Sequence, residues 1–306
     1  TYPELYRFVT KGNRILIDDG NIILDVDMVS GKEVHCKVVA GGTIKRRKTV
    51  NVPGVHLEFP GLSEKDKGDI KFAIEKNFDV ISASFIRNKE DAMLVREAIG
   101  DSNIKMIAKV EDWEGVEKFD EVLEVTDGIM VARGDMGVEL PIEKVPLLQK
   151  EFIRKCREKG KFVIVATQML ESMKENPRPT RAEVTDVANA VLDGADMLML
   201  SAETSTGKYP VEAVKMMKTI IKEVQKIHEP SIIEKDSEAS QETDSICRTI
   251  ARLTEEIKLK GVIILSRTGR TVASLSRHRI KVPIWAVTDN ALLVRQLNLF
   301  YGTEGM

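Results

Sequence analysis

Five short apolar segments recur along the middle of the chain, and each one ends in polar or charged residues. The segments are rich in Ile, Val and Met, which is typical of strands buried in a parallel sheet. Helical patterns lie between them, and this alternation predicts a parallel α/β sheet with right-handed crossovers. In a (βα)8 barrel the active site lies at the carboxyl ends of the strands. The segments comprise residues 80–84, 106–111, 128–135, 163–168 and 197–203.

Two of these segments predict a charged site. Lys109 and Glu111 end one segment, and Arg133 and Asp135 end the next. Because side chains alternate along a strand, the two members of each pair are expected to share one side of the sheet. One carboxylate per strand beside a lysine suits a divalent cation and an anionic substrate. A structural salt bridge at a sheet end is the competing interpretation, but the polar ends of all five segments favour a catalytic site.

The motifs of the chain resemble those of the pyruvate kinase family. Residues 104–116, IKMIAKVEDWEGV, are similar to the family's signature segment, with Asp112 where a small polar or basic residue is usual. Because Asp112 points away from Lys109 and Glu111, we expect it to matter little for the chemistry. The order and spacing of the motifs match the family from about residue 15 to about residue 288. The other motifs are NVPG at 51–54, SEKDKGDIKF at 63–72, SFIR at 84–87, DGIMVARGDMGVE at 127–139, ATQMLESM at 166–173, PRPTRAEVTDVANAVLDGAD at 177–196 and LSAETSTGKYP at 200–210.

The resemblance implies an α/β fold: a (βα)8 TIM-type barrel, a small β-barrel lid inserted into it, and a C-terminal α/β domain. Only five of the eight βα units are found here, so we expect the chain to begin inside the lid and to be a fragment, or an incompletely described part, of a longer protein. Short strands expected at 14–17, 22–26 and 34–39 fit the lid. The lid would comprise residues 1–52, the catalytic barrel 53–228 and the regulatory domain 229–306.

The resemblance also implies roles for residues at the strand ends. Glu111 and Asp135 would bind Mg²⁺ or Mn²⁺, and Lys109 would lie over the transferring phosphoryl group as a fixed cation. Backbone N–H groups of Gly134 and Asp135, at the start of a helical turn, would bind the substrate carboxylate. Thr167 would bind the same carboxylate near the carbon that is protonated. The alternative for Thr167 is a hydroxyl group satisfied by the local backbone.

Three further residues are assigned from the family. Ser201 and Glu203 would extend a proton relay from Thr167, unless they only support the neighbouring strands. Lys48, in the basic run at residues 45–48, aligns with a lysine that contacts nucleotide phosphate in the family. A solvated face is the alternative explanation of such a run.

The C-terminal region is expected to follow a polar linker at residues 229–243, with a helix from 244 to about 259 and strands at 261–265 and 284–288. The loop after the first of these strands combines hydroxyl groups, a glycine and two arginines ahead of a helix, which suits a phosphate group. It resembles the loop where the family binds phosphorylated effectors, and an ordinary strand–helix loop is the alternative. The loop consists of Ser266, Arg267, Thr268, Gly269, Arg270 and Thr271.

Composition limits the partners of the protein. The net charge of −2 gives no argument for binding nucleic acid. No apolar run approaches the ~20 residues of a membrane span, and no signal peptide is expected at the N-terminus. The three cysteines are far apart, as in a cytoplasmic protein with reduced thiols.

The activity implied by the resemblance is phosphoryl transfer from phosphoenolpyruvate to ADP, which yields pyruvate and ATP. The family further implies K⁺, bound through residues that this chain lacks, and a homotetramer for the full-length protein. Two alternatives stay open. One is a divalent-metal-dependent pyruvate aldolase or lyase on the same barrel, which would need neither the lid nor Lys109. The other is an inactive fragment that only binds ligand.

Overall fold

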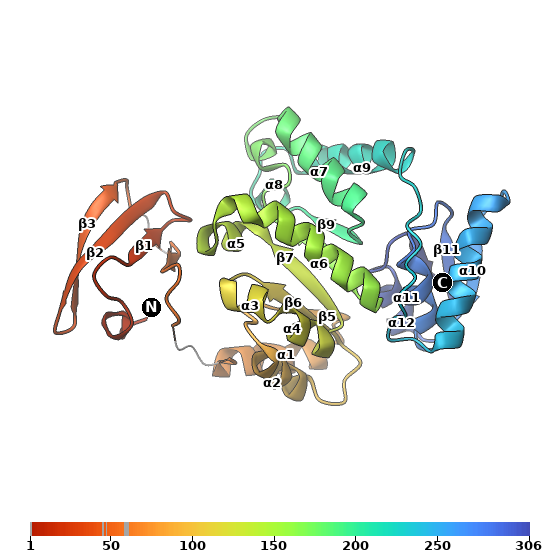
Figure 1. The fold of residues 1–306 in the computed structure, drawn as a ribbon, viewed down its shortest axis with the longest axis horizontal. Coiled ribbons are helices and arrows are strands. Elements are labelled where there is room, and N and C mark those ends of the chain that lie inside the picture. Colours follow the sequence, from red (N-terminus) through yellow and green to blue (C-terminus); the bar gives the residue numbers. More distant parts are fainter. Residues whose placement is uncertain (1, 45, 47, 58–60) are drawn as a thin grey trace.

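The computed structural model describes residues 2–44, 46, 48–57 and 61–306 (Figure 1). Three sheets follow one another along the chain: an antiparallel sheet near the N-terminus, a five-stranded parallel sheet in the middle, and a three-stranded parallel sheet near the C-terminus. The first and third lie at opposite ends of the molecule, with the five-stranded sheet and its helices between them. Among the described residues, no helix is both long enough and apolar enough to cross a membrane.

The central sheet contains the five predicted strands in their sequence order, all parallel. Every residue of the third and fourth strands is buried, which explains why their sequences are apolar without alternation. The fold expectation of a partial TIM-type barrel is therefore confirmed. The strands are β5 (Val80–Ala83), β6 (Lys105–Val110), β7 (Gly128–Ala132), β8 (Phe162–Ala166) and β9 (Met197–Met199).

The helices around this sheet begin and end where capping residues predict. Ser63 and Asp66 form a capping box at the start of α1, and Thr180 does the same with Glu183 at α7. Gly160 adopts a left-handed conformation at the end of α6, as a C-terminal glycine commonly does. The elements are α1 (Glu64–Glu75), α2 (Lys89–Ile99), α3 (Trp113–Glu117), α4 (Phe119–Val125), α5 (Arg133–Glu139), η2 (Ile142–Lys144), α6 (Val145–Lys159), η3 (Glu171–Lys174), α7 (Arg181–Asp193), α8 (Ala202–Ser205) and α9 (Pro210–Gln225).

The N-terminal part, expected to be the lid, forms a four-stranded antiparallel sheet in the order β3-β2-β1-β4 after a short helix, η1. Its own small core contains Val9, Ile15, Val26 and Val52. In the described residues the outer strands β3 and β4 do not pair with each other, so the expected barrel is present here as an open sheet. The elements are η1 (Leu5–Arg7), β1 (Arg14–Ile17), β2 (Ile22–Ser30), β3 (Glu33–Ala40) and β4 (Val50–Asn51).

The C-terminal part builds a parallel sheet in the order β10-β11-β12. Its first helix begins three residues earlier than predicted, because Ser240 caps it by accepting a hydrogen bond from the Thr243 N–H. The last strand has only three residues and was not predicted from the sequence. The elements are α10 (Gln241–Glu256), β10 (Val262–Leu265), α11 (Arg270–Ser276), β11 (Ile284–Val287), α12 (Ala291–Leu297) and β12 (Thr303–Gly305).

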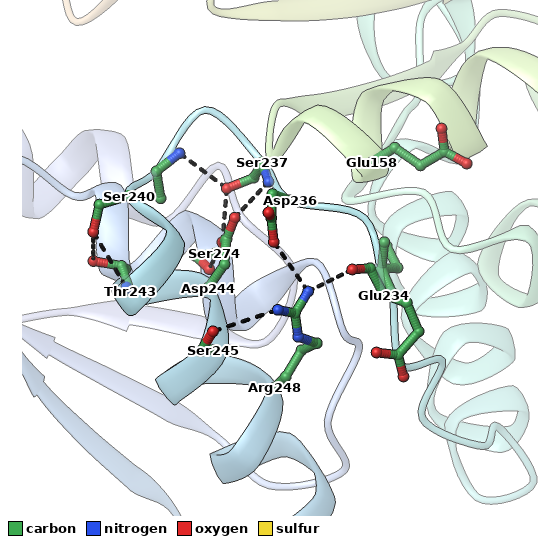
Figure 2. Close-up of polar contacts among 12 residues, drawn as sticks. Glu158, Glu234, Asp236, Ser237, Ser240, Thr243, Asp244, Ser245, Arg248 and Ser274 are labelled. Carbon is green, nitrogen blue, oxygen red and sulfur yellow. Dashed lines mark hydrogen bonds and ion pairs between the residues drawn. The ribbon is translucent and has the colours of Figure 1, made fainter.

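Polar contacts hold the segment predicted as a linker against the C-terminal domain (Figure 2). The buried carboxylate of Asp244 accepts hydrogen bonds from the Ser237 N–H and hydroxyl and from the Ser274 hydroxyl. Arg248 pairs with Asp236 and donates to the Glu234 carbonyl. The polar groups of this segment therefore form specific hydrogen bonds and an ion pair with α10.

The C-terminal domain packs against the amino ends of the barrel strands. Arg295 pairs with Asp79, directly before β5. The Gln296 amide donates to the carbonyls of Asp79 and Asn103, which precede β5 and β6. Phe300 packs edge-on against Phe162 at the start of β8, with ring centroids 5.5 Å apart. The carboxyl ends of the strands, where the site is predicted, therefore lie at the opposite edge of the sheet, away from these contacts.

His278 is fully buried beside this interface. Its burial predicts that the protein becomes less stable in acid. Its Nδ1 accepts a hydrogen bond of 3.1 Å from the Ile233 N–H, so Nε2 must carry the proton. Burial, reinforced by the positive charges of Arg277 and Arg157, lowers the pKa of His278 from 6.5 to about 3, whereas Asp244 opposes the shift. The folded protein then binds fewer protons than the unfolded chain between pH 6.5 and 3. The contribution of neutral His278 to the free energy of unfolding is therefore complete above pH 6.5 and is lost progressively as the pH falls below 6.5.

We expect the His278→Asn variant to lose this acid sensitivity, because the amide oxygen can accept the Ile233 N–H but does not titrate. Between pH 7 and pH 5 the wild-type protein should lose roughly 1–2 kcal/mol more stability than the variant. The measurement is urea unfolding at a series of pH values. His35→Asn, at an exposed lid histidine, is the control. Equal pH dependence in the wild type and His278→Asn would contradict the assignment.

Candidate active site

Lys109 and Glu111 meet at the carboxyl end of β6, as predicted. The Lys109 Nζ lies 2.7 Å from the Glu111 Oε1 and donates a 2.9 Å hydrogen bond to the Ser84 hydroxyl. The other Glu111 oxygen accepts a 2.7 Å hydrogen bond from the Phe85 N–H. Glu111 is only 1% exposed, whereas the Lys109 side chain is 24% exposed, so the ammonium group is the accessible member of the pair.

Burial raises the pKa of Glu111, opposed by Lys109, and the negative charge of Asp135 raises it further. Asp135 belongs to the first turn of α5, which follows the adjacent strand β7. Two carboxylates beside a single lysine leave an excess of negative charge that a hard divalent cation would compensate. No group of three or more His, Cys, Asp or Glu side chains in the described ranges could hold a metal ion. Water and substrate oxygens would therefore have to supply the other ligands.

The prediction that Arg133 shares a side with Asp135 is wrong. It assumed that strand alternation continues, but β7 ends at Ala132 and Arg133 begins helix α5. The Arg133 guanidinium lies 2.7 Å from the Asp186 carboxylate and donates a 2.7 Å hydrogen bond to the Thr167 carbonyl. Arg133 therefore braces the loop after β8, while the first turn of α5 carries Gly134 and Asp135 as expected.

Thr167 follows β8 with a φ of +69°, a left-handed conformation that is unfavourable for a β-branched residue. Its hydroxyl accepts a 2.8 Å hydrogen bond from the Gly134 N–H and donates one of 2.6 Å to the Ala166 carbonyl. The alternative of a hydroxyl satisfied by backbone is thus observed. The same contacts also bring Thr167 directly beside Gly134, where a Cβ would approach the hydroxyl oxygen to 3.2 Å.

Glu203 is fully buried at the start of α8. Its carboxylate accepts hydrogen bonds of 2.8 Å from the Ser201 N–H and 3.1 Å from the Leu170 N–H. These bonds tie the end of β9 to the loop after β8. The contacts favour the support role for Ser201 and Glu203, and a proton relay through them stays a prediction.

Two predicted sites lie outside this cluster. Lys48 pairs with Asp18 in the lid at 2.5 Å, and its side chain is 36% exposed. In the C-terminal domain, the Ser266 hydroxyl accepts a 2.9 Å hydrogen bond from the Gly269 N–H, which shapes the loop before α11. Gly269 itself has a φ of +81°. Phosphate binding at Lys48 or by this loop, residues 266–271, stays a prediction.

Ser84 and Phe85 were not predicted as site residues. The sequence shows that β5 ends in hydroxyl groups, but it does not show that Ser84 faces Lys109, which lies 25 positions further along the chain. Phe85 has a φ of +55°, and this unusual backbone directs its N–H toward Glu111. Both residues act by fixing the Lys109–Glu111 pair.

A cavity of about 720 Å³ lies next to this cluster, between the segment that leaves the lid and β5. Ser84 and Asp112 line it, but Lys109, Glu111, Asp135 and Thr167 do not. Asp112 accepts a hydrogen bond from the Gly115 N–H and caps α3, which agrees with its expected orientation away from the Lys109–Glu111 pair. The charged cluster therefore faces the open carboxyl edge of the sheet.

Parallel strands of a TIM-type barrel with a lysine and two carboxylates at their carboxyl ends define an α/β-barrel protein with a site suited to an anionic substrate. Sequence comparison gives the family. Residues 1–214 match the barrel domain of pyruvate kinase, and residues 244–306 match its alpha/beta domain. The chain belongs to the pyruvate kinase family.

Curated relatives agree with this assignment. The chain is 44% identical to a pyruvate kinase of Clostridium acetobutylicum, over 99% of this chain and 66% of the relative. It is 46% identical to a pyruvate kinase of Geobacillus stearothermophilus, over 99% of this chain and 53% of the relative. It is 46% identical to human pyruvate kinase PKLR, over 98% of this chain and 54% of the relative. The chain thus spans between half and two thirds of the length of these relatives.

Proposed function

We propose that the full-length protein transfers the phosphoryl group of phosphoenolpyruvate to ADP and releases pyruvate and ATP. The observation that carries the proposal is the ammonium group of Lys109, held 2.7 Å from the buried Glu111 carboxylate, with Asp135 in the helical turn that follows the adjacent strand β7. Phosphoryl transfer needs positioning and charge neutralisation more than covalent chemistry from the protein. A fixed cation beside two metal-binding carboxylates meets that need.

Each charged group has a distinct role in this proposal. Mg²⁺ or Mn²⁺, held by Glu111 and Asp135, would neutralise charge on substrate oxygens when bound. Lys109 would face the developing charge on the phosphoryl group and on the enolate oxygen. The Ser84 hydroxyl accepts from the Lys109 ammonium without cancelling its charge. Ser84 would therefore keep Lys109 oriented if Glu111 held a metal ion.

The substrate carboxylate would bind at the contact between α5 and the loop after β8. Here the Gly134 N–H and the Thr167 hydroxyl are already hydrogen-bonded to each other and can reorient toward an anion. Thr167 would also lie near the carbon that receives a proton. Glu203 would hold this loop in place through the Leu170 N–H. Lys48 would contact a phosphate of ADP from the lid.

The direct test is an ADP-dependent assay of the full-length protein with phosphoenolpyruvate, with and without Mg²⁺ and K⁺. We expect ATP and pyruvate in equal amounts, and no reaction without the divalent ion. A metal-dependent aldolase or lyase would instead act on pyruvate or its aldol products in the absence of ADP. Light scattering of the same preparation tests the proposed homotetramer.

We expect Glu111→Gln and Asp135→Asn to weaken Mn²⁺ binding at least about tenfold each, because each change removes one charged ligand. Titration calorimetry of the full-length protein measures the affinity. Asp69→Asn, which changes an exposed carboxylate on α1 that pairs with Lys65, is the matched control and should bind Mn²⁺ normally. Unchanged affinity in both site variants would exclude this pair as the metal ligands.

A further inference from the structure

The segment that leaves the lid, residues 50–57, is fastened to the barrel by three polar contacts. The Asn51 amide donates a 2.8 Å hydrogen bond to the Glu139 carboxylate. The His56 Nδ1 lies 3.2 Å from the Glu114 carboxylate. The Arg87 guanidinium donates to the Leu57 carbonyl at 3.4 Å. These contacts reach three different places on the barrel, and only the first reaches α5.

The contact at Glu139 joins two functional parts of the molecule. Asn51 belongs to β4 and pairs with Leu16 of β1, so it is a fixed part of the lid sheet. Glu139 is the last residue of α5, and the first turn of this helix carries Gly134 and Asp135. A helix of seven residues transmits displacement with little internal bending. One side-chain hydrogen bond therefore connects the lid sheet to the helix that carries a proposed metal ligand.

The charges around this hydrogen bond make its loss costly. Glu139 and Asn51 are both partly buried, and both line the cavity between the lid exit and β5. Burial raises the pKa of Glu139, and the negative charges of Asp112 and Asp135 raise it further, while the Asn51 hydrogen bond opposes the shift. The Asn51 amide therefore stabilises a partly desolvated carboxylate that lies near two other carboxylates. If this donor is lost, the negative charge of Glu139 is left uncompensated.

We propose that the Asn51–Glu139 hydrogen bond is a latch that fixes the orientation of the lid relative to α5 and so positions the nucleotide against the metal site. Asn51 and Glu139 are assigned as positioning residues, because neither belongs to the groups proposed to bind substrate or metal. The role in nucleotide positioning rests on the proposed function, whereas the mechanical coupling of lid and helix does not. Loss of the latch should broaden the range of lid orientations and raise the KM for ADP. The KM for phosphoenolpyruvate, which would bind on the barrel alone, should change little.

Reversing the polarity of the hydrogen bond tests the latch. Glu139→Gln alone should be close to wild type, because the amide oxygen still accepts from Asn51. Asn51→Asp alone places two carboxylates in contact and should raise the KM for ADP about tenfold, the scale of one lost charge-assisted hydrogen bond. The double change Asn51→Asp with Glu139→Gln exchanges donor and acceptor, and should return the KM for ADP to within about twofold of wild type. His56→Gln removes a different lid-exit contact that does not reach α5, and is the matched control.

Lid orientation is measured separately by the distance between spin labels in the full-length protein. Exposed positions Lys37 on β3 and Glu97 on α2 can be changed to cysteine in a Cys36→Ser background. We expect a broader distance distribution in Asn51→Asp and a narrow one again in the double variant. A narrow distribution in Asn51→Asp, or a double variant that stays broad, would overturn the latch. If the distributions behave as expected but no variant, including wild type, makes ATP, the latch stands and the proposed function fails.

Discussion

The Lys109→Met variant of the full-length protein is expected to fold normally with Mg²⁺ present and to transfer phosphoryl groups about 10²–10³-fold more slowly than wild type. The Lys109 ammonium is the accessible cation of the site, and Ser84 orients it independently of Glu111. Methionine keeps most of the side-chain volume but removes the charge that faces the transferring group. The kcat for ATP formation should therefore fall, while binding of phosphoenolpyruvate weakens only modestly.

A purely structural Lys109–Glu111 salt bridge makes the opposite prediction. In that case Lys109→Met would mainly destabilise the fold, because the buried Glu111 would lose its partner. Thermal unfolding with Mg²⁺ and steady-state kinetics on the same samples separate the two interpretations. A Lys109→Met protein with a normal kcat would leave only the salt bridge.

Proton exchange at the methyl carbon of pyruvate provides an internal control for this variant. Protonation is expected from the side of Thr167, which contacts the α5 turn and not Lys109. Lys109→Met should then retain much of the exchange, whereas Thr167→Val should lose it. Loss of exchange in both variants would indicate a general collapse of the site instead of a specific role for Lys109.

The parts of the fold that local patterns determine were predictable from the sequence. The five barrel strands follow from apolar runs of strand length. Helix starts at Ser63, Asn88 and Thr180 follow from side chains that accept a hydrogen bond from the backbone N–H three residues on. The Lys109–Glu111 pair was also predictable, because two residues on one strand face the same side.

Contacts that depend on tertiary packing were not predictable. The side-chain direction of Arg133 was predicted wrongly. Alternation of side chains holds only up to the last residue of a strand, and the sequence does not mark where β7 ends and α5 begins. The Asn51–Glu139 hydrogen bond joins residues 88 positions apart with no local signal at either one. Glu203 was named as a site residue from the sequence, but the hydrogen bond that its buried carboxylate accepts from the distant Leu170 N–H was not predictable.

The second large effect is expected at the interface between the barrel and the C-terminal domain, where Arg279 is 1% exposed. Its guanidinium donates hydrogen bonds of 3.0 and 2.6 Å to the Gly194 carbonyl at the end of α7. It also lies 2.9 Å from the Asp196 carboxylate and 5.0 Å from the centre of the Tyr301 ring. Asp196 is itself buried, and it accepts hydrogen bonds from the Val163 and Tyr301 N–H groups. Arg279 thus balances the negative charge of Asp196, whose carboxylate connects β8 to the turn before β12.

We expect Arg279→Met to destabilise the protein by about 3–5 kcal/mol, the usual cost of removing one member of a buried ion pair. Unfolding in urea can be followed through Trp285 of β11 in a Trp113→Phe background, which reports on the C-terminal domain. Lys281→Met, two residues away, breaks an exposed ion pair with Glu229 and should cost less than about 1 kcal/mol.

Two companion variants determine why Arg279 matters. Arg279→Lys keeps the charge but loses the planar fork that contacts Gly194 and Asp196 together, so its cost should fall between those of wild type and Arg279→Met. Asp196→Asn added to Arg279→Met should recover only part of the loss, because the uncompensated charge is then gone but the single amide oxygen can accept from only one of the Val163 and Tyr301 N–H groups. If Arg279→Met costs no more than Lys281→Met, the guanidinium only fills space, and the two domains are held together by apolar contacts such as that between Phe162 and Phe300.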